Sequence, residues 1–265
     1  MELTSIRAEV ADDGVATLTL ARPEAGNGIN RQLAYELNEV TTTWSVDPRV
    51  RAVLLQGEGA NFCVGGDLKS FAARDDLPAH LTDVTTYFHA AIARLARLDA
   101  PVVTAVQGNA AGGGFSLALA GDVVLAGASS RFVLAYTAIG LTPDGGGTWL
   151  LPRLVGLRRA LDLTLTNRRL TAEEAVAEGL ATRVVPDDAL ADEALALARS
   201  LAAGPTGALG AAKRLLRGSL GHDLEHQLAL ETESLAAAAG SVDAREGIDA
   251  FLAKRVPRFD GQERW

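Results

Sequence analysis

The stretch from Pro101 to Asp122, PVVTAVQGNAAGGGFSLALAGD, constrains the fold more than any other part of the chain. Its first residues are small and β-branched apolar ones, which is typical of a buried strand. The glycines Gly112–Gly114 then open a helix, where backbone N–H groups can approach a ligand with the positive end of the helix dipole behind them. The stretch predicts a strand, a turn and a helix that either pack tightly or bind an anion, or an oxygen that becomes one.

Strands and helices alternate on both sides of this stretch. Apolar patterns predict strands over residues 14–20, 50–56, 102–106, 122–126, 131–135 and 182–185. A helix with an apolar stripe is expected to begin after a cap at Asn30 and to be ended by Asp47-Pro48, and a second one is expected over 81–98. A capping box starts another helix at Thr171. Beyond the last strand the chain is rich in Ala and Leu. We therefore expect an α/β core over residues 1–200 and a helical C-terminal region over 201–265.

Composition argues against several classes of protein. With 265 residues, 48% of them hydrophobic, the chain can bury a large core. A net charge of -8 disfavours nucleic acid as a partner. The N-terminus lacks a signal pattern, and Asp122 interrupts the most apolar window, so we expect no membrane partner. The single cysteine, Cys63, cannot form an intrachain disulfide, which favours a cytoplasmic location.

Three short patterns point to other chemistries but lack the residues to support them. Gly114–Ala118 falls one residue short of a GxSxG nucleophile elbow, and the only histidines that follow lie in the helical tail. His222–His226 matches an HxxEH zinc pattern, but it lies in an ordinary amphipathic helix without an obvious third ligand. Neither GxGxxG nor GxxxxGK occurs, so a dinucleotide or nucleoside triphosphate site has no support. We expect no metal.

Two glycine turns and one aspartate form a stronger constellation. The segments Cys63–Asp67 and Ala110–Phe115 each follow a strand, and each can offer one N–H group to a single carbonyl oxygen. Asp144 lies in a Pro-Asp-Gly-Gly-Gly turn where nothing structural requires an acid. Taken alone, a plain turn aspartate is the better interpretation of that context.

Together these segments resemble the enoyl-CoA hydratase/isomerase (crotonase) superfamily. The motifs are FCVGGDL at 62–68, QGNAAGGG at 107–114 and PDGGGT at 143–148, and the resemblance covers nearly the whole chain. It implies an α/β fold, namely a crotonase-type spiral of repeated β-β-α units with a C-terminal helical region. It also implies an acyl-CoA thioester substrate, with coenzyme A entering as part of the substrate and no separate cofactor. The C-terminal helices would then cover the active site and make the contacts of a homotrimer or a dimer of trimers.

The resemblance also implies roles for individual residues. The backbone N–H groups of Val64 and Gly113 would form an oxyanion hole that holds the thioester oxygen as it becomes an enolate. Ser116 and Tyr136 stand where the family's hydratases carry two glutamates, and they would line the acyl pocket with His89. Backbone groups of two loops would contact coenzyme A: Ala25, Gly26, Asn27, Gly28, Gly65, Gly66, Asp67 and Leu68.

The departures from the hydratase pattern favour one reaction. Without the two glutamates a hydratase lacks the carboxylates that activate and add water. Asp144 instead matches the acid of the 3-enoyl to 2-enoyl-CoA isomerases and of ring-1,2-epoxyphenylacetyl-CoA isomerase. One carboxylate suits an isomerisation, because it takes a proton from C2 and returns it further along the chain. The resemblance therefore predicts an acyl-CoA double-bond isomerase with Asp144 as its acid and base, acting in fatty or aromatic acid degradation.

Three alternatives remain open at this point. The first is an enoyl-CoA hydratase or a related acyl-CoA lyase. The second is a hydrolase like 4-chlorobenzoyl-CoA dehalogenase, which carries a nucleophilic Asp at the Asp144 position and a His at the His89 position, and forms an aryl-enzyme intermediate. The third is an inactive crotonase-fold scaffold or RNA-binding protein, which would also lack both glutamates. The acidic composition and the presence of Asp144 argue against this third alternative.

Overall fold

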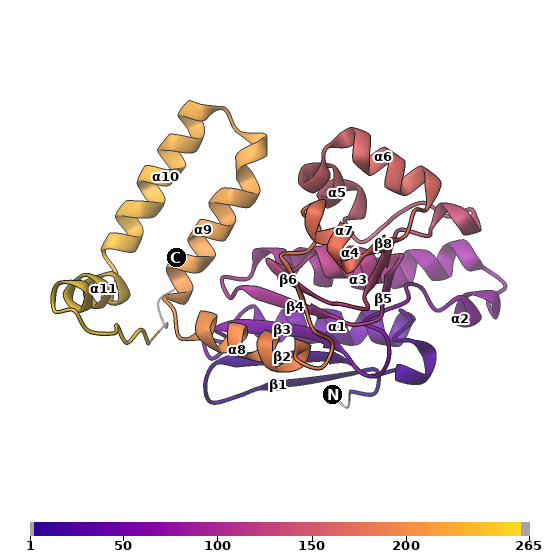
Figure 1. The fold of residues 1–265 in the computed structure, drawn as a ribbon, viewed down its shortest axis with the longest axis horizontal. Helices are drawn as coiled ribbons and strands as arrows, with labels where there is room; N and C mark the ends of the chain where they lie inside the picture. Colours follow the sequence, from indigo (N-terminus) through magenta and orange to yellow (C-terminus); the bar gives the residue numbers. More distant parts are fainter. Residues whose placement is uncertain (1–2, 261–265) are drawn as a thin grey trace.

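The apolar runs of the sequence form a six-stranded sheet at the centre of the protein, which the computed structural model describes over residues 3–260 (Figure 1). Its strands lie in the order β1 (Ile6–Val10), β2 (Val15–Leu20), β3 (Ala52–Gly57), β4 (Val102–Val106), β6 (Val123–Gly127) and β9 (Arg183–Val185). β1 pairs antiparallel with β2, and the other neighbours are parallel. β1 was not predicted, because Ile6 is its only buried residue.

Helices cover both faces of this sheet. Helices α1 (Arg31–Trp44) and α3 (Leu77–Arg97) lie against each other on one side, and α8 (Leu190–Ala202) packs on the other. Successive strand residues supply the two faces: Leu55 of β3 joins the core with α1 and α3, whereas Leu54 packs with α8. Burial on both faces explains why the parallel strands read as uninterrupted apolar runs.

The structure contains a second, smaller sheet of three strands. It contains β5 (Asn109–Ala111), β7 (Arg131–Val133) and β8 (Leu170–Thr171) in that order. The chain leaves β4 for β5 at Gly108, whose φ is +56° and where a Cβ atom would meet the carbonyl oxygen of Ala60. After β5 comes α4 (Gly113–Leu119), which completes a strand–strand–helix unit. The predicted α/β fold is confirmed, although the three residues of β5 were read as a turn.

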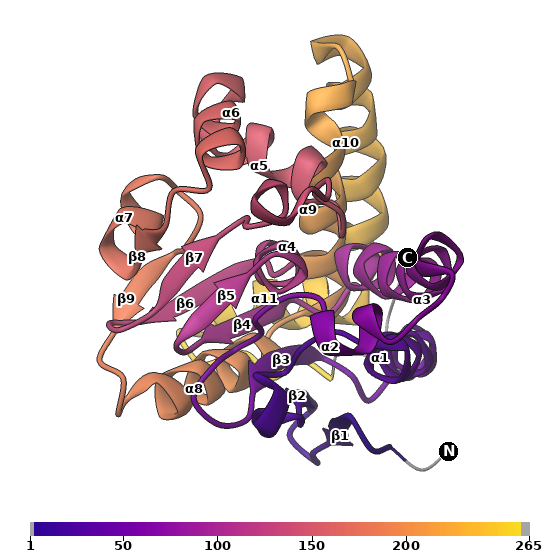
Figure 2. The same ribbon diagram turned by 90° about the vertical axis from the view of Figure 1, so that its right-hand side faces the viewer.

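The remaining core elements are short and connect these layers. The helices are α2 (Leu68–Ala72), α5 (Gly147–Val155), α6 (Leu157–Thr166) and α7 (Ala172–Ala177), and 3₁₀ turns lie at Pro23–Ala25 and Thr137–Ile139. A third 3₁₀ turn, Ser219–Gly221, lies in the C-terminal region. The capping box predicted at Thr171 is present, because its side chain and that of Glu174 each accept from the other residue's amide. Figure 2 shows α5, α6 and α7 on the side of β7 and β8, away from α1 and α2.

The C-terminal region is helical and stands beside the core. It contains α9 (Thr206–Gly218), α10 (Leu224–Ala239) and α11 (Val242–Leu252), and Figure 1 shows α10 far from the sheet. Lys213 anchors α9, since its buried Nζ lies 2.6 Å from Asp122 Oδ2 and donates to the Leu95 carbonyl oxygen at 3.0 Å. α10 has no buried residue. Over residues 3–260, no helix combines the length and apolar character needed to cross a bilayer.

Candidate active site

A cavity of about 380 Å³ lies where the predicted motifs converge. One wall is the face of α3 from Leu81 to Phe88, and the opposite wall runs from Ala135 to Asp144. Between them lie the loop before α2 and the first turn of α4. Most of its wall is apolar, and Asp144 is the one charged side chain among the described residues that line it. The cavity therefore presents a single carboxylate to whatever it binds.

The first turn of α4 contributes an unused backbone donor to this cavity. Gly113 lines the cavity, and its amide has no acceptor within residues 3–260, as is normal for the first turn of a helix. Gly114 fixes the depth at which the helix packs, since a Cβ there would lie 2.1 Å from the Cys63 carbonyl oxygen. The predicted site residue Gly113 is thus placed on the cavity wall.

The loop before α2 offers a donor at a different residue from the one predicted. The Val64 amide, predicted as an oxyanion donor, already donates to the Gly26 carbonyl oxygen at 3.0 Å and is not free to bind a substrate oxygen in this structure. In the same loop the Ile29 amide donates to the Gly65 carbonyl, and the Asp67 amide donates to the Ile29 carbonyl. Residue 66 lies between these two bonded residues in an extended chain, so its own N–H points away from Ile29.

Gly66 is therefore the residue of this loop whose amide is free. It lines the cavity, and its N–H group has no acceptor within residues 3–260. Sequence reasoning assigned Gly66 to coenzyme A and did not single out its free amide. The signal that distinguishes it from Val64 is the pairing with Ile29, which is distant in sequence and cannot be read from the local motif.

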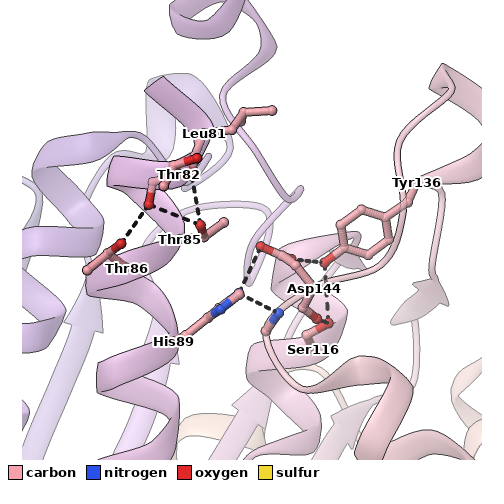
Figure 3. Close-up of polar contacts among 9 residues, drawn as sticks. Leu81, Thr82, Thr85, Thr86, His89, Ser116, Tyr136 and Asp144 are labelled. Carbon is pink, nitrogen blue, oxygen red and sulfur yellow. Dashed lines mark hydrogen bonds and ion pairs between the residues drawn. The ribbon is translucent and has the colours of Figure 1, made fainter. Parts of the chain in front are cut away.

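Asp144 is held by two hydroxyl groups on the side away from α3 (Figure 3). Tyr136 Oη donates to Asp144 Oδ1 at 2.5 Å, and Ser116 Oγ donates to the Asp144 backbone carbonyl at 2.8 Å. Burial, followed by the neighbouring Asp144 charge, raises the pKa of Tyr136 above its ordinary value. The phenol therefore stays protonated and remains a donor. Tyr136 lines the cavity as predicted, whereas Ser116 is buried behind it.

His89 contacts Asp144 from α3 without lining the same cavity. Its Nε2 accepts from the Gly145 amide at 3.1 Å and lies 3.4 Å from Asp144 Oδ2 (Figure 3). A backbone N–H can only donate, so this arrangement assigns the ring proton to Nδ1. The nearer ring nitrogen is then an acceptor beside a carboxylate oxygen, and Oδ2 receives no hydrogen bond from it.

The residues predicted to contact coenzyme A fall into two groups. Gly65, Gly66 and Leu68 line the cavity, whereas the loop Ala25–Gly28 and Asp67 do not. Asn27 is fully buried, and its amide nitrogen donates to two backbone carbonyls. The Asp67 carboxylate accepts from Arg22 and from the Ser70 amide in the first turn of α2. The side chains of Asn27 and Asp67 therefore hold these two loops in place and do not face the cavity.

Two free backbone donors beside one carboxylate make a site that can hold a carbonyl oxygen and move a proton next to it. Residues 10–262 match the enoyl-CoA hydratase/isomerase family, and the chain belongs to that family. It is thus an enzyme of the enoyl-CoA hydratase/isomerase family, whose substrates are acyl-CoA thioesters.

Relatives with different names share almost the full length of the chain. A 1,2-epoxyphenylacetyl-CoA isomerase of Escherichia coli is 43% identical, covering 95% of this chain and 97% of its own. A protein of Rhodobacter capsulatus described as an enoyl-CoA hydratase is 40% identical, covering 99% and 100%. The crystal structure of an enoyl-CoA hydratase/isomerase from Mycobacterium abscessus superposes with a TM-score of 0.92, at 37% identity over 97% of this chain and 99% of that one. The predicted crotonase fold is confirmed.

Proposed function

We propose that the protein is an acyl-CoA double-bond isomerase of the 3-enoyl to 2-enoyl type, with Asp144 as its single acid and base. The observation that supports this reaction is that Asp144 is the sole carboxylate on the described wall of the cavity. Shifting a double bond needs one group that removes a proton and returns it to the same substrate. The similarity to an epoxyphenylacetyl-CoA isomerase also favours an isomerisation.

The chemistry follows from where the free groups lie. The thioester oxygen accepts hydrogen bonds from the Gly66 and Gly113 amides, while Asp144 Oδ2 removes a proton from C2. The electrons of that C–H bond move toward the carbonyl, and the oxygen becomes an enolate. Return of the proton to C4 moves the double bond from C3–C4 to C2–C3, and Asp144 is again a carboxylate. Each amide contributes about 2.7–4 kcal/mol to the stability of the transition state.

Tyr136 and Ser116 act as positioning residues in this scheme. Tyr136 donates a hydrogen bond to Oδ1 of Asp144, which leaves Oδ2 as the oxygen that exchanges protons with the substrate. The bond from Ser116 fixes the backbone carbonyl of the same residue. The carboxylate is thereby held in one orientation, which a base must keep while a proton moves between two carbons.

Hydration is the alternative that the name of the R. capsulatus relative suggests. Adding water requires one group to activate the water and another to protonate the carbon. The two positions that carry glutamates in family hydratases hold Ser116 and Tyr136 here, and both hydroxyls are bonded to Asp144. A single carboxylate accordingly favours isomerisation.

The contact between His89 and Asp144 favours a second candidate, the displacement of a ring substituent by the Asp144 carboxylate. In that reaction a water molecule must later attack the aryl ester, with His89 as its base. Release of halide from an aroyl-CoA, lost in His89→Gln, would establish this reaction. We rank it second because the nearer nitrogen of His89 already accepts from the Gly145 amide.

Coenzyme A and assembly complete the proposal. Backbone groups of Gly65, Gly66 and Leu68, and of the loop Ala25–Gly28 beside them, contact the coenzyme A moiety.

We further propose that the C-terminal helices cover neighbouring copies in a trimer or a dimer of trimers in the cytoplasm. The exposed leucines of α10, such as Leu228 with 50% of its surface accessible, are suited to such contacts.

The decisive test replaces Asp144 by Asn, which keeps the size of the side chain and removes the base. We expect turnover of a 3-enoyl-CoA, followed by the absorbance of the conjugated product, to fall about 10²–10⁴-fold with little change in KM. Asp188→Asn is the matched control, because Asp188 is exposed and does not line the cavity. Undiminished turnover in Asp144→Asn would refute the mechanism.

A further inference from the structure

A second cavity, of about 530 Å³, lies directly behind the candidate active site. It is enclosed by the C-terminal half of α3, the start of α5 and the end of α9. Its apolar wall contains Ile92, Ala93, Ala96, Trp149 and Leu150. Nothing in the isomerisation proposed above uses this space.

The polar part of this cavity is basic. Three arginines line it, namely Arg97, Arg214 and Arg217, and no acidic residue does within the described chain. Arg214 pairs with Asp99, and Arg217 donates to Asp122 at 2.8 Å. Arg97 is exposed and has no hydrogen-bond or ion-pair partner among residues 3–260. In a chain with a net charge of -8, the unpaired Arg97 on a cavity wall that carries no acid suits an anionic group of a ligand.

The two cavities are adjacent, because consecutive residues of one loop line them. Asp144 lines the first cavity, and the next residue, Gly145, lines the second together with His89. The His89 ring lies at this boundary, where it contacts both Gly145 and Asp144 (Figure 3). Its side chain is 48% exposed, so it has room to turn aside at the loss of one hydrogen bond.

We propose that the second cavity binds the far end of an acyl group that ends in a carboxylate, so that the substrates include the coenzyme A thioesters of dicarboxylic acids. This proposal rests on the proposed binding of the thioester between Gly66, Gly113 and Asp144. The acyl chain passes His89, its methylene groups pack on the apolar wall, and its carboxylate meets Arg97.

The geometry of α3 sets a length requirement. Arg97 lies eight residues beyond His89, which is about 12 Å along the helix. Side chains on a helix generally lean back toward its N-terminus, which would shorten that gap. A short acyl group cannot reach the arginine, so the benefit of a terminal carboxylate depends on chain length.

Binding of saturated thioesters tests this without requiring turnover. Pairs of acyl-CoA molecules with six to twelve carbons, ending in either a carboxylate or a methyl group, are titrated by calorimetry into the full-length protein. We expect the carboxylate form to bind at least about tenfold tighter at one chain length and equally at the shortest. Arg97→Gln should abolish that preference, and Arg97→Glu should reverse it.

Arg158→Gln is the matched control, since Arg158 is equally exposed and lines neither cavity. It should retain the full preference. No preference in the wild-type protein at any chain length, or a preference that survives in Arg97→Gln, overturns the inference. Turnover of a short 3-enoyl-CoA, which does not reach the second cavity, reports separately on the proposed isomerase activity.

Discussion

The two free amides on the cavity wall are held in different ways. Gly113 belongs to α4, whose packing against the Cys63 backbone leaves no room for a side chain at the next residue. Gly66 belongs to a loop, and bonds to Ile29 from residues 65 and 67 determine where its N–H points. One donor is therefore fixed by a helix start and the other by contacts with a distant segment. The helix start was readable from the sequence, and the loop was not.

The largest expected effect comes from a change that disturbs both donors together. In Gly114→Ala the new Cβ would lie 2.1 Å from the Cys63 carbonyl oxygen and 2.7 Å from its Cβ, so α4 and the loop cannot keep their present distance. We expect the free energy of unfolding to fall by about 3 kcal/mol or more, measured by urea denaturation.

Gly221→Ala provides the control for this substitution. Gly221 has no heavy atom near its Cβ position and no positive φ, so its replacement should leave stability within about 0.5 kcal/mol. If Gly114→Ala were as stable as this control, the two donors would not share the tight contact described above.

The contrast between the donors shows how far sequence reasoning reaches. Local periodicity, or a motif within one segment, was enough to predict the parallel strands of the large sheet, the long helices of the core, Gly113 and Asp144. The choice between Val64 and Gly66 depends on Gly26 and Ile29, more than thirty residues earlier in the chain. The short strand β5 and the place of His89 between two cavities likewise follow from tertiary contacts.

Removing one N–H group at a time tests the assignment of the second donor. Replacement of residue 66 by an α-hydroxy acid turns its amide into an ester and deletes the donor with little change in shape. We expect kcat for a 3-enoyl-CoA to fall about 10²–10³-fold with stability almost unchanged. The measurement is steady-state kinetics beside thermal unfolding.

The same ester replacement at residue 64 provides the comparison. It deletes the donor to the Gly26 carbonyl, so we expect a loss of about 1 kcal/mol in stability and a much smaller loss in kcat. The reverse pattern, with the larger loss of kcat at residue 64, would restore Val64 as the oxyanion donor.

The smallest expected effect concerns the ion pair that braces the Gly66 loop. Arg22 Nη2 lies 2.9 Å from Asp67 Oδ2, and these side chains are 17% and 13% exposed. Partial burial alone would raise the pKa of Asp67, but the Arg22 guanidinium and the Ser70 amide hold it below its ordinary value. A lowered pKa in the folded state means that this pair stabilises the fold above pH 4, and that the benefit is lost as the pH falls through the folded value.

Arg22→Met should therefore reduce the free energy of unfolding by about 2 kcal/mol at pH 7, and the difference from the wild-type protein should shrink below about pH 4. Because the hydrogen bonds of residues 65 and 67 to Ile29 still hold the Gly66 amide in place, we expect kcat to fall less than tenfold. Arg49→Met removes the exposed partner of Asp47, and because this pair is screened by solvent it should leave the free energy of unfolding almost unchanged. A difference for Arg22→Met that stays constant down to pH 2 would mean that Arg22 braces the loop through the Gly28 carbonyl, to which it also donates, and not through the charge of Asp67.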